Sequence, residues 1–238
     1  MIDPLPGIRR IAVLRANGLG DFVVAEPALA ALRHAYPDAQ LTLIGRPWHV
    51  SLLAGRPGPW DEVVSAPPYP MLNAPADTPA DSPEVRQFFD WALAQEFDLA
   101  VQLHGGGAAS NPFVSKLGAR VTVGARDHGA PPLHRSLPYT LYQHEVARWL
   151  EVVGLAGACP ARLLPALCVT DADRMQARRW LPDPTPDASP LVVIHPGASD
   201  PRRRWPPASF ASVVGGLVAD GARVVLVGGG DDRRVARE

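Results

Sequence analysis

The chain has 238 residues, of which 47% are hydrophobic, and its formal net charge is −1. This length accommodates one large domain or two small domains with an apolar core. The lack of a positive net charge argues against nucleic acid as a partner. No apolar stretch approaches the roughly 20 residues that span a bilayer, and the proline-broken start does not resemble a signal peptide. We therefore expect a cytoplasmic protein.

The first informative segment joins an apolar strand to a turn with two glycines and then to a helix. Residues 11–14 are apolar, Gly18 and Gly20 stand in the turn, and Asp21 follows at once. Glycines after a strand let the backbone approach a ligand closely. Asp21 has two interpretations, because it can cap the helix or face a ligand as a general base. We expect the helix either to begin at Pro27 or to bend there.

Strand-like and helix-like runs alternate through the first 153 residues, which predicts a parallel sheet covered by helices. We expect strands at 11–14, 41–44, 62–64, 99–103 and 121–123, and helices at 27–36, 48–53, 84–95, 111–117 and 142–153. Residues 66–83 are rich in proline and poor in bulky apolar side chains. That composition predicts a long, flexible loop at the edge of a binding site.

A connector rich in proline and alanine follows, and then the pattern of strands and helices restarts. We expect a helix at 171–180 within the connector, strands at 191–194 and 224–227, and a helix at 207–219. The restart predicts a first domain at 1–170 and a second at 171–238. Two parallel strands rarely bury enough surface to stand alone, so we expect the chain to be cut short within its second domain.

Two turns of the second domain carry candidate ligand-binding residues. Residues 195–199 follow a strand and precede Arg204, and backbone amides with a nearby guanidinium suit a phosphorylated ligand. The alternative is a solvated run of arginines before a helix. The second turn, at 228–230, is followed by Asp231 and Asp232, whose carboxylates can accept ribose hydroxyls or cap a helix.

Neither a nicotinamide cofactor nor a metal ion is expected. Gly18 and Gly20 match the first two glycines of a dinucleotide-binding motif, but Val23 stands in place of the third. The second predicted strand ends in Gly-Arg, where that motif has an acidic residue. Cys159 and Cys168 form no metal-binding motif.

Further polar residues are candidates for binding a second substrate. His104 ends a predicted strand and precedes three glycines, so it can face a ligand or simply occupy a turn. Arg126, His128 and Arg135 are expected in a polar loop after the strand at 121–123. There they can bind an anionic acceptor or be solvated. For Trp149 a structural role is expected.

Taken in chain order, these segments resemble glycosyltransferase family 9, whose best-known members are the ADP-heptose:lipopolysaccharide heptosyltransferases. The resemblance covers nearly the whole chain. Its matching pieces are Gly18-Leu19-Gly20-Asp21, Pro27, Leu32-Arg33, Pro37, Phe97–Leu103, Gly118-Ala119-Arg120, Gly124, His195–Ser199, Arg204-Trp205-Pro206 and Gly228-Gly229.

The resemblance implies an α/β fold of the GT-B type, in which two Rossmann-like domains face each other across a cleft and the second is here truncated. It implies that the first domain binds a glycan or glycolipid acceptor and the second a nucleotide sugar such as ADP-heptose. It also implies an inverting transfer without a metal or other cofactor. The acceptor would bring the protein to the inner face of the cytoplasmic membrane. Two alternatives stay open: a degenerate homologue that binds without catalysis, and another GT-B activity such as nucleotide-sugar epimerisation.

The resemblance also assigns residues. Asp21 falls on the family's proposed catalytic base, and Arg204 falls where the family usually has a lysine near the diphosphate. The family's later acidic motif is absent. We assign acceptor binding to Gly18, Gly20, His104, Arg126 and His128. We assign nucleotide-sugar binding to Gly197, Ala198, Ser199, Arg204, Gly229, Asp231 and Asp232.

Overall fold

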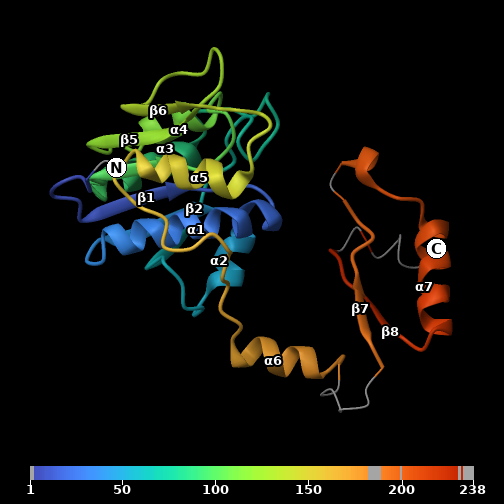
Figure 1. The fold of residues 1–238 in the computed structure, drawn as a ribbon. Coiled ribbons are helices and arrows are strands. Elements are labelled where there is room, and N and C mark those ends of the chain that lie inside the picture. The colour runs from blue at the N-terminus through green and yellow to red at the C-terminus, as the bar shows by residue number, and fades with distance from the viewer. Residues whose placement is uncertain (1–2, 182–188, 199, 230–231, 233–238) are drawn as a thin grey trace. The chain divides into compact units, whose positions relative to one another are not determined.

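The structure, a computed structural model, describes residues 3–181, 189–198, 200–229 and 232. The chain divides into two compact units, Met1–Asp171 and Ala172–Glu238. Each unit has its own parallel sheet (Figure 1).

The first unit is built on a sheet of six parallel strands. Its strands are β1 (Arg10–Leu14), β2 (Gln40–Gly45), β3 (Glu62–Ser65), β4 (Leu99–Gln102), β5 (Val121–Arg126) and β6 (Arg135–Pro138). They lie side by side in the order β3-β2-β1-β4-β5-β6. After β1 the chain adds β2 and β3 on one side, and it then returns to add β4, β5 and β6 on the other side of β1. Ligands of such sheets bind beside the carboxyl ends of the strands at this reversal, the topological switch point.

Helices cover both faces of the sheet. The helices of this unit are α1 (Leu19–Ala35), α2 (Pro47–Leu53), α3 (Pro83–Ala94), α4 (Ser110–Ser115) and α5 (Glu145–Gly154). Alternate residues of β1 point to opposite faces, so Ile11 and Val13 join one buried cluster and Ala12 and Leu14 join another. The first cluster lies under α1 and α5 and the second under α3 and α4. Figure 1 shows α1 and α5 together on one side of the sheet.

Helix α1 begins at Leu19 and continues through Pro27. A proline inside a helix removes one hydrogen bond and costs about 3 kcal/mol. Burial of Phe22 and Leu29 against the sheet offsets that cost, since each fully buried side chain contributes about 2 kcal/mol. The early start makes Gly18 the N-cap and places Asp21 in the first turn, from where its side chain can accept a hydrogen bond from the Gly18 amide.

The prediction of a polar loop after residue 123 was also wrong. Strand β5 continues to Arg126, and Arg135 begins β6, which pairs with β5 in the register Val123–Arg135. This edge strand is short, polar at its start and ends in Pro138. Proline is tolerated at an edge because its missing amide faces no partner, and such a segment has no apolar pattern to reveal it.

The loop at 66–83 was predicted to be flexible, but part of it packs against the core and is held by its own hydrogen bonds. Tyr69 and Leu72 are buried in the cluster beneath α3. The Asn73 side chain ties the loop to itself, because its Oδ1 accepts from the Tyr69 amide at 2.8 Å and its Nδ2 donates to the Pro67 carbonyl at 3.0 Å. These contacts give the proline-rich segment a defined course.

The second unit has a sheet of two parallel strands in its described residues. Its elements are α6 (Asp171–Arg178), β7 (Leu191–Ile194), the short 3-10 helix η1 (Pro201–Arg203), α7 (Pro207–Ala219) and β8 (Arg223–Leu226). The first residue of α6, Asp171, still belongs to the first unit. Val193 and Val218 are more than half exposed. In the described part of the whole chain, every helix is too short or too polar to cross a membrane.

Candidate functional site

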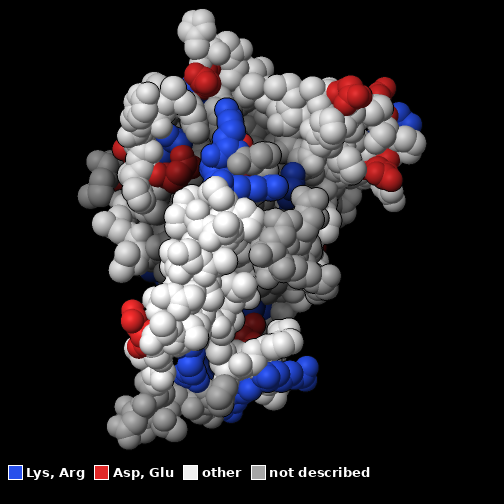
Figure 2. All heavy atoms as spheres, turned by 90° about the vertical axis from the view of Figure 1, so that its right-hand side faces the viewer, with Lys and Arg blue, Asp and Glu red and all other residues white. Residues whose placement is uncertain are grey.

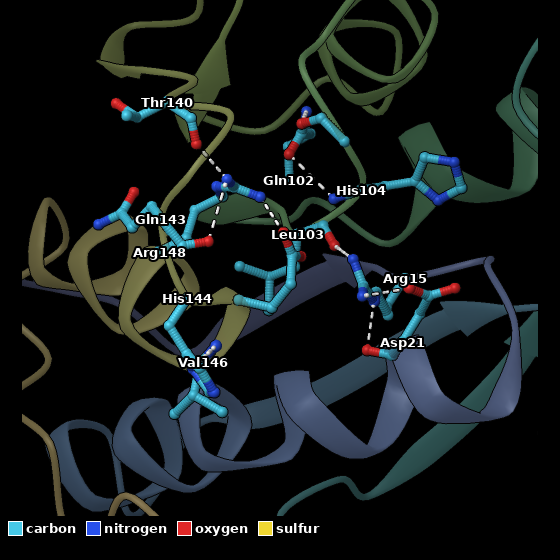
Figure 3. Close-up of polar contacts among 12 residues, drawn as sticks. Arg15, Asp21, Gln102, Leu103, His104, Thr140, Gln143, His144, Val146 and Arg148 are labelled. Atoms are coloured by element: carbon cyan, nitrogen blue, oxygen red, sulfur yellow. Dashed lines mark hydrogen bonds and ion pairs between the residues drawn. The ribbon is translucent and has the colours of Figure 1, made fainter.

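The candidate site lies at the switch point of the first unit, where β1 and β4 end side by side. Arg15 and the turn to α1 follow β1, while Leu103 and His104 follow β4. The Leu103 amide donates to the Leu14 carbonyl at 3.0 Å, so the two strand ends are held in register. Asp21, in the first turn of α1, lies beside this junction (Figure 3).

Asp21 combines a fixed position with an accessible carboxylate. Its Oδ2 accepts a hydrogen bond from the Gly18 amide at 3.1 Å. Its Oδ1 lies 3.6 Å from Nη2 of Arg15, and half of the side chain is exposed. Helix capping therefore occupies one oxygen, and the other is oriented by a cation while solvent reaches the group. Both interpretations of this residue are compatible with the geometry.

Arg15 is the buried centre of the site and is only 1% exposed. Its Nε donates to the Asp21 carbonyl at 2.8 Å and its Nη1 to the Leu103 carbonyl. Its Nη2 is buried with no hydrogen-bond partner among the described residues. Figure 3 shows the guanidinium between Asp21 and Leu103. One side chain therefore links the end of β1, the start of α1 and the end of β4.

An aromatic side chain from α5 stabilises this buried charge. The guanidinium carbon of Arg15 lies 4.9 Å from the ring centroid of Trp149, a cation–π distance. Burial lowers the pKa of Arg15 to about 10, against the opposing attraction of Asp21. The group is still cationic at neutral pH. Trp149 is fully buried, in agreement with its expected structural role.

His104 lies at the same junction but is held by backbone groups. Its Nδ1 accepts from the Ala16 amide at 3.2 Å, and its own amide donates to Gln102 Oε1 at 3.0 Å. Burial, with the nearby charges of Arg15 and Arg46, lowers its pKa to about 4. His104 is therefore neutral at pH 7. Because Nδ1 is an acceptor here, Nε2 carries the ring proton, and the Leu72 backbone is a further hydrogen-bonding partner of the ring.

The two glycines of the turn have different surroundings. A side chain at Gly18 would meet the Asp21 carboxylate at 3.4 Å, whereas the position of Gly20 opens on free space. Neither residue has a positive φ. Neither the space around these two positions nor their backbone conformation therefore requires glycine.

Arg126 and His128 lie further along the same edge of the sheet. They line a cavity of about 670 Å³ together with Asp127, Gly129, Ser136, Leu137 and Pro138. Arg126 Nε donates to the Ala130 carbonyl at 2.7 Å, which holds the loop after β5. The structure groups these two residues with each other and not with Asp21.

In the second unit, the two predicted turns meet at the carboxyl ends of β7 and β8. Asp232 joins them, because its Oδ2 accepts from the Gly229 amide at 2.7 Å and lies 3.6 Å from His195 Nε2. A Cβ at Gly197 would lie 1.8 Å from Asp232 Oδ1, so a side chain at this position would displace the Asp232 carboxylate. The Asp232 carboxylate is thus placed between the turns.

Arg204 also contacts the first of these turns. Its Nε donates to the Ala198 carbonyl at 2.7 Å. Arg202 instead pairs with Asp200 at 2.7 Å. The predicted residues Ser199 and Asp231 lie outside the described part of the structure.

Among the described residues on the face drawn in Figure 2, Lys and Arg side chains form small groups, some of them beside Asp or Glu side chains. Within the described residues, no group of three or more His, Cys, Asp or Glu side chains is placed to hold a metal ion.

Sequence reasoning missed Arg15, the most connected side chain of the site. The available signal was a single arginine at the end of the apolar run Ile-Ala-Val-Leu, directly before the turn. A charged residue at that point of a buried strand is unusual unless it has partners. Those partners come from distant segments and cannot be read locally.

Comparison with solved structures supports this fold. A glycosyl transferase of family 9 from Veillonella parvula superposes with a TM-score of 0.75 at 18% identity, covering 96% of this chain and 65% of that one. The E. coli ADP-heptose lps heptosyltransferase II gives 0.67 at 19% identity, over 96% and 67% of the two chains. E. coli heptosyltransferase WaaC with ADP gives 0.62 at 16% identity, over 96% and 71%. At these identities the likeness establishes the GT-B type of α/β fold.

Sequence comparison supplies the family. Among proteins of curated function, none matches this sequence. The model of glycosyltransferase family 9 (heptosyltransferase) matches residues 86–238, well over half of the chain. Asp21 and Arg15 lie outside the matched residues, so the argument that they belong to a functional site rests on their geometry. The switch-point fold, the joined turns of the second unit and this match lead to one assignment: the chain belongs to glycosyltransferase family 9.

Proposed function

We propose that the protein transfers a sugar from a nucleotide-sugar donor, such as ADP-heptose, to a lipopolysaccharide-type glycan acceptor, with inversion at the anomeric carbon and without a metal. The observation that carries this proposal is the accessible Asp21 carboxylate, held at the switch point by the Gly18 amide and by buried Arg15. Membership of glycosyltransferase family 9 (heptosyltransferase) supports this choice of donor and acceptor. The acceptor would bring the protein to the cytoplasmic face of the membrane.

In the proposed reaction, Asp21 takes the proton of an acceptor hydroxyl. The hydroxyl oxygen forms a bond to the anomeric carbon of the donor, and the bond from that carbon to the diphosphate oxygen breaks on the opposite face. A positioned carboxylate of this kind contributes about 10² to 10⁴ in rate. Arg15 keeps the carboxylate aimed, because its guanidinium is fixed by two backbone carbonyls.

The departing diphosphate needs compensation for its developing negative charge. We assign this role to the first turn of the second unit, through its backbone amides and the Arg204 guanidinium. Asp232, between the two turns, would accept the ribose hydroxyls of the donor. In this proposal the first unit binds the acceptor and the second binds the donor.

The test is a transfer assay with a panel of nucleotide sugars, using deacylated lipopolysaccharide core as the acceptor. Transfer from a nucleotide sugar, with the opposite anomeric configuration in the NMR spectrum of the product, supports the proposal. Binding of donor and acceptor without transfer favours a degenerate homologue. Interconversion of the free donor favours epimerisation.

A further inference from the structure

A cavity of about 860 Å³ lies in the first unit where β2 and β3 end, beside the switch point. The turn after β2, the loop after β3 and one face of α3 form its walls. On α3 the lining residues are Glu84, Gln87, Phe88 and Trp91. Their spacing of three, four and seven residues places them on one face of the helix.

The lining combines aromatic surface with a few hydrogen-bonding groups. Trp48 and three prolines (Pro47, Pro67 and Pro68) add to the apolar surface from α3, and Arg46, Ser65 and Asn73 add to its polar groups. The electron-rich face of an aromatic ring attracts the weakly positive C–H groups of a sugar ring. Carboxylate, amide and guanidinium groups pair with its hydroxyls. Because one arginine and one glutamate balance each other, the lining suits a neutral polyhydroxylated ring better than a phosphate.

The walls of this cavity are fixed before any ligand arrives. The Arg46 Nη2 donates to the Asn73 carbonyl at 3.2 Å, which ties the turn after β2 to the loop after β3. The Trp48 ring stacks on His49 with centroids 3.6 Å apart. Trp91 lies between Phe88 and Phe97, at 5.3 and 6.3 Å. A preformed wall reduces the entropy lost on binding.

We propose that this cavity is a subsite for a neutral sugar residue of the acceptor, next to the residue that is glycosylated. The inference rests on the proposed function and extends it to the number of acceptor sugars that the protein recognises. Neighbouring strands lie about 5 Å apart, so the ends of β1 and β3 are separated by about 10 Å. Asp21 at the start of α1 and the cavity beside α3 both lie at the carboxyl edge of the sheet, so a glycan bound across this edge places one sugar at Asp21 and an adjoining sugar in the cavity. The acceptor recognised is therefore at least a disaccharide.

Kinetics with two acceptors test the subsite. The acceptors are a deacylated lipopolysaccharide core oligosaccharide and the methyl glycoside of the sugar that receives the transfer. Glu84→Gln and Gln87→Ala change exposed residues on the cavity face of α3, and Asp90→Asn is the matched control on the same helix, outside the lining. The two cavity variants should raise KM for the oligosaccharide about three- to tenfold, the effect of one lost hydrogen bond. Their KM values for the methyl glycoside and the donor should not change, and Asp90→Asn should match the parent.

An unchanged KM for the oligosaccharide, or an equal rise for both acceptors, would overturn the subsite. A binding titration separates this inference from the proposed function, because Trp48 and Trp91 report on the cavity by fluorescence. If no sugar is transferred, the proposed function fails, and the titration then tests the subsite independently. Saturable quenching by the oligosaccharide, weakened in Glu84→Gln and Gln87→Ala but not in Asp90→Asn, supports the subsite. No saturable change, or equal binding by all variants, rejects it.

Discussion

The Nη2 of Arg15 and the Oδ1 of Asp21 face each other at 3.6 Å across the junction of β1 and α1. The two groups differ in exposure, since the guanidinium is buried and half of the carboxylate side chain is open to solvent. A buried charge needs partners, and two backbone carbonyls with the Trp149 ring meet most of that need. Arg15 therefore serves as a rigid support, and Asp21 is the part of the pair that can reach a substrate.

Replacing Asp21 by Asn separates capping from catalysis. The amide oxygen of Asn can still accept from the Gly18 amide, so the free energy of unfolding should change little. Transfer turnover should fall about 10²- to 10⁴-fold, because the amide cannot accept the proton. Initial rates and thermal unfolding measure the two effects.

Asp98→Asn is the matched control for that experiment. Asp98 also accepts backbone amides, from Arg9 and Arg10, but at the amino end of β4. Its turnover should equal that of the parent. Parent-like turnover in Asp21→Asn would leave Asp21 with a capping role alone.

Arg15→Lys should reveal a positioning role. Lysine keeps the charge but cannot donate in a fixed fork to the Leu103 and Asp21 carbonyls together. We expect a lower kcat with an unchanged donor KM, and a loss of about 1–3 kcal/mol in the free energy of unfolding from the unpaired carbonyl. Urea denaturation and steady-state kinetics measure these. The control is Arg120→Lys, an exposed arginine near Asp98. A change in donor KM without a change in kcat would contradict the positioning role.

The stability of the first unit should fall in mild acid. His49 is fully buried, and burial lowers its pKa from 6.5 to about 4. Between these values the unfolded chain binds a proton that the folded chain does not, so stability is present above pH 6.5 and is lost as the pH falls towards 4. The difference corresponds to about 3 kcal/mol. Urea denaturation between pH 4.5 and 7.5 measures the slope.

His49→Asn should make that slope shallower. The Asn side chain can still accept from the Arg46 amide, as His49 Nδ1 does at 2.9 Å. The control is His34→Asn at an exposed position of α1, which should keep the parental slope. An identical slope in His49→Asn would exclude this histidine as the source.

Arg204→Ala should weaken nucleotide binding. Hydrogen bonds to charged groups contribute about 1.5–3 kcal/mol, so the Kd for ADP should rise at least about tenfold. Binding of the acceptor oligosaccharide should not change. Calorimetry measures both, and Arg202→Ala serves as the control, because Arg202 pairs with Asp200. Loss of acceptor binding with intact ADP binding would mean that the roles of the two units are reversed.

The first unit should fold without the second. Both buried clusters are formed by residues up to Ala158, and the connector is held by buried Glu26, which pairs with Arg162 and accepts from the Ala166 amide at 2.9 Å. A protein of residues 1–171 should therefore show a cooperative thermal transition by circular dichroism. A non-cooperative transition in 1–171, beside a cooperative one in 1–238, would contradict this.

Local pattern was sufficient for most elements of the fold. The apolar runs at β1 and β7 and the helix at 207–219 were predicted to within a residue, because each has a continuous apolar signal and clear ends. Strand β6 was missed, since four residues with a polar start become a strand only by pairing with β5. The proline-rich segment 66–83 was predicted to be a flexible loop, but Tyr69 and Leu72 within it are buried in the cluster beneath α3.

The candidate site divides in the same way. The sequence by itself identified Asp21, because a carboxylate directly after a strand and a glycine turn is a local pattern. It could not identify Arg15, whose partners come from α1, the residue after β4, and α5. Nor could it join Gly197 and Gly229 through Asp232, since that contact depends on β7 and β8 ending at one edge. Hydrophobic periodicity sets local structure, whereas strand order and side-chain burial decide which distant polar groups meet.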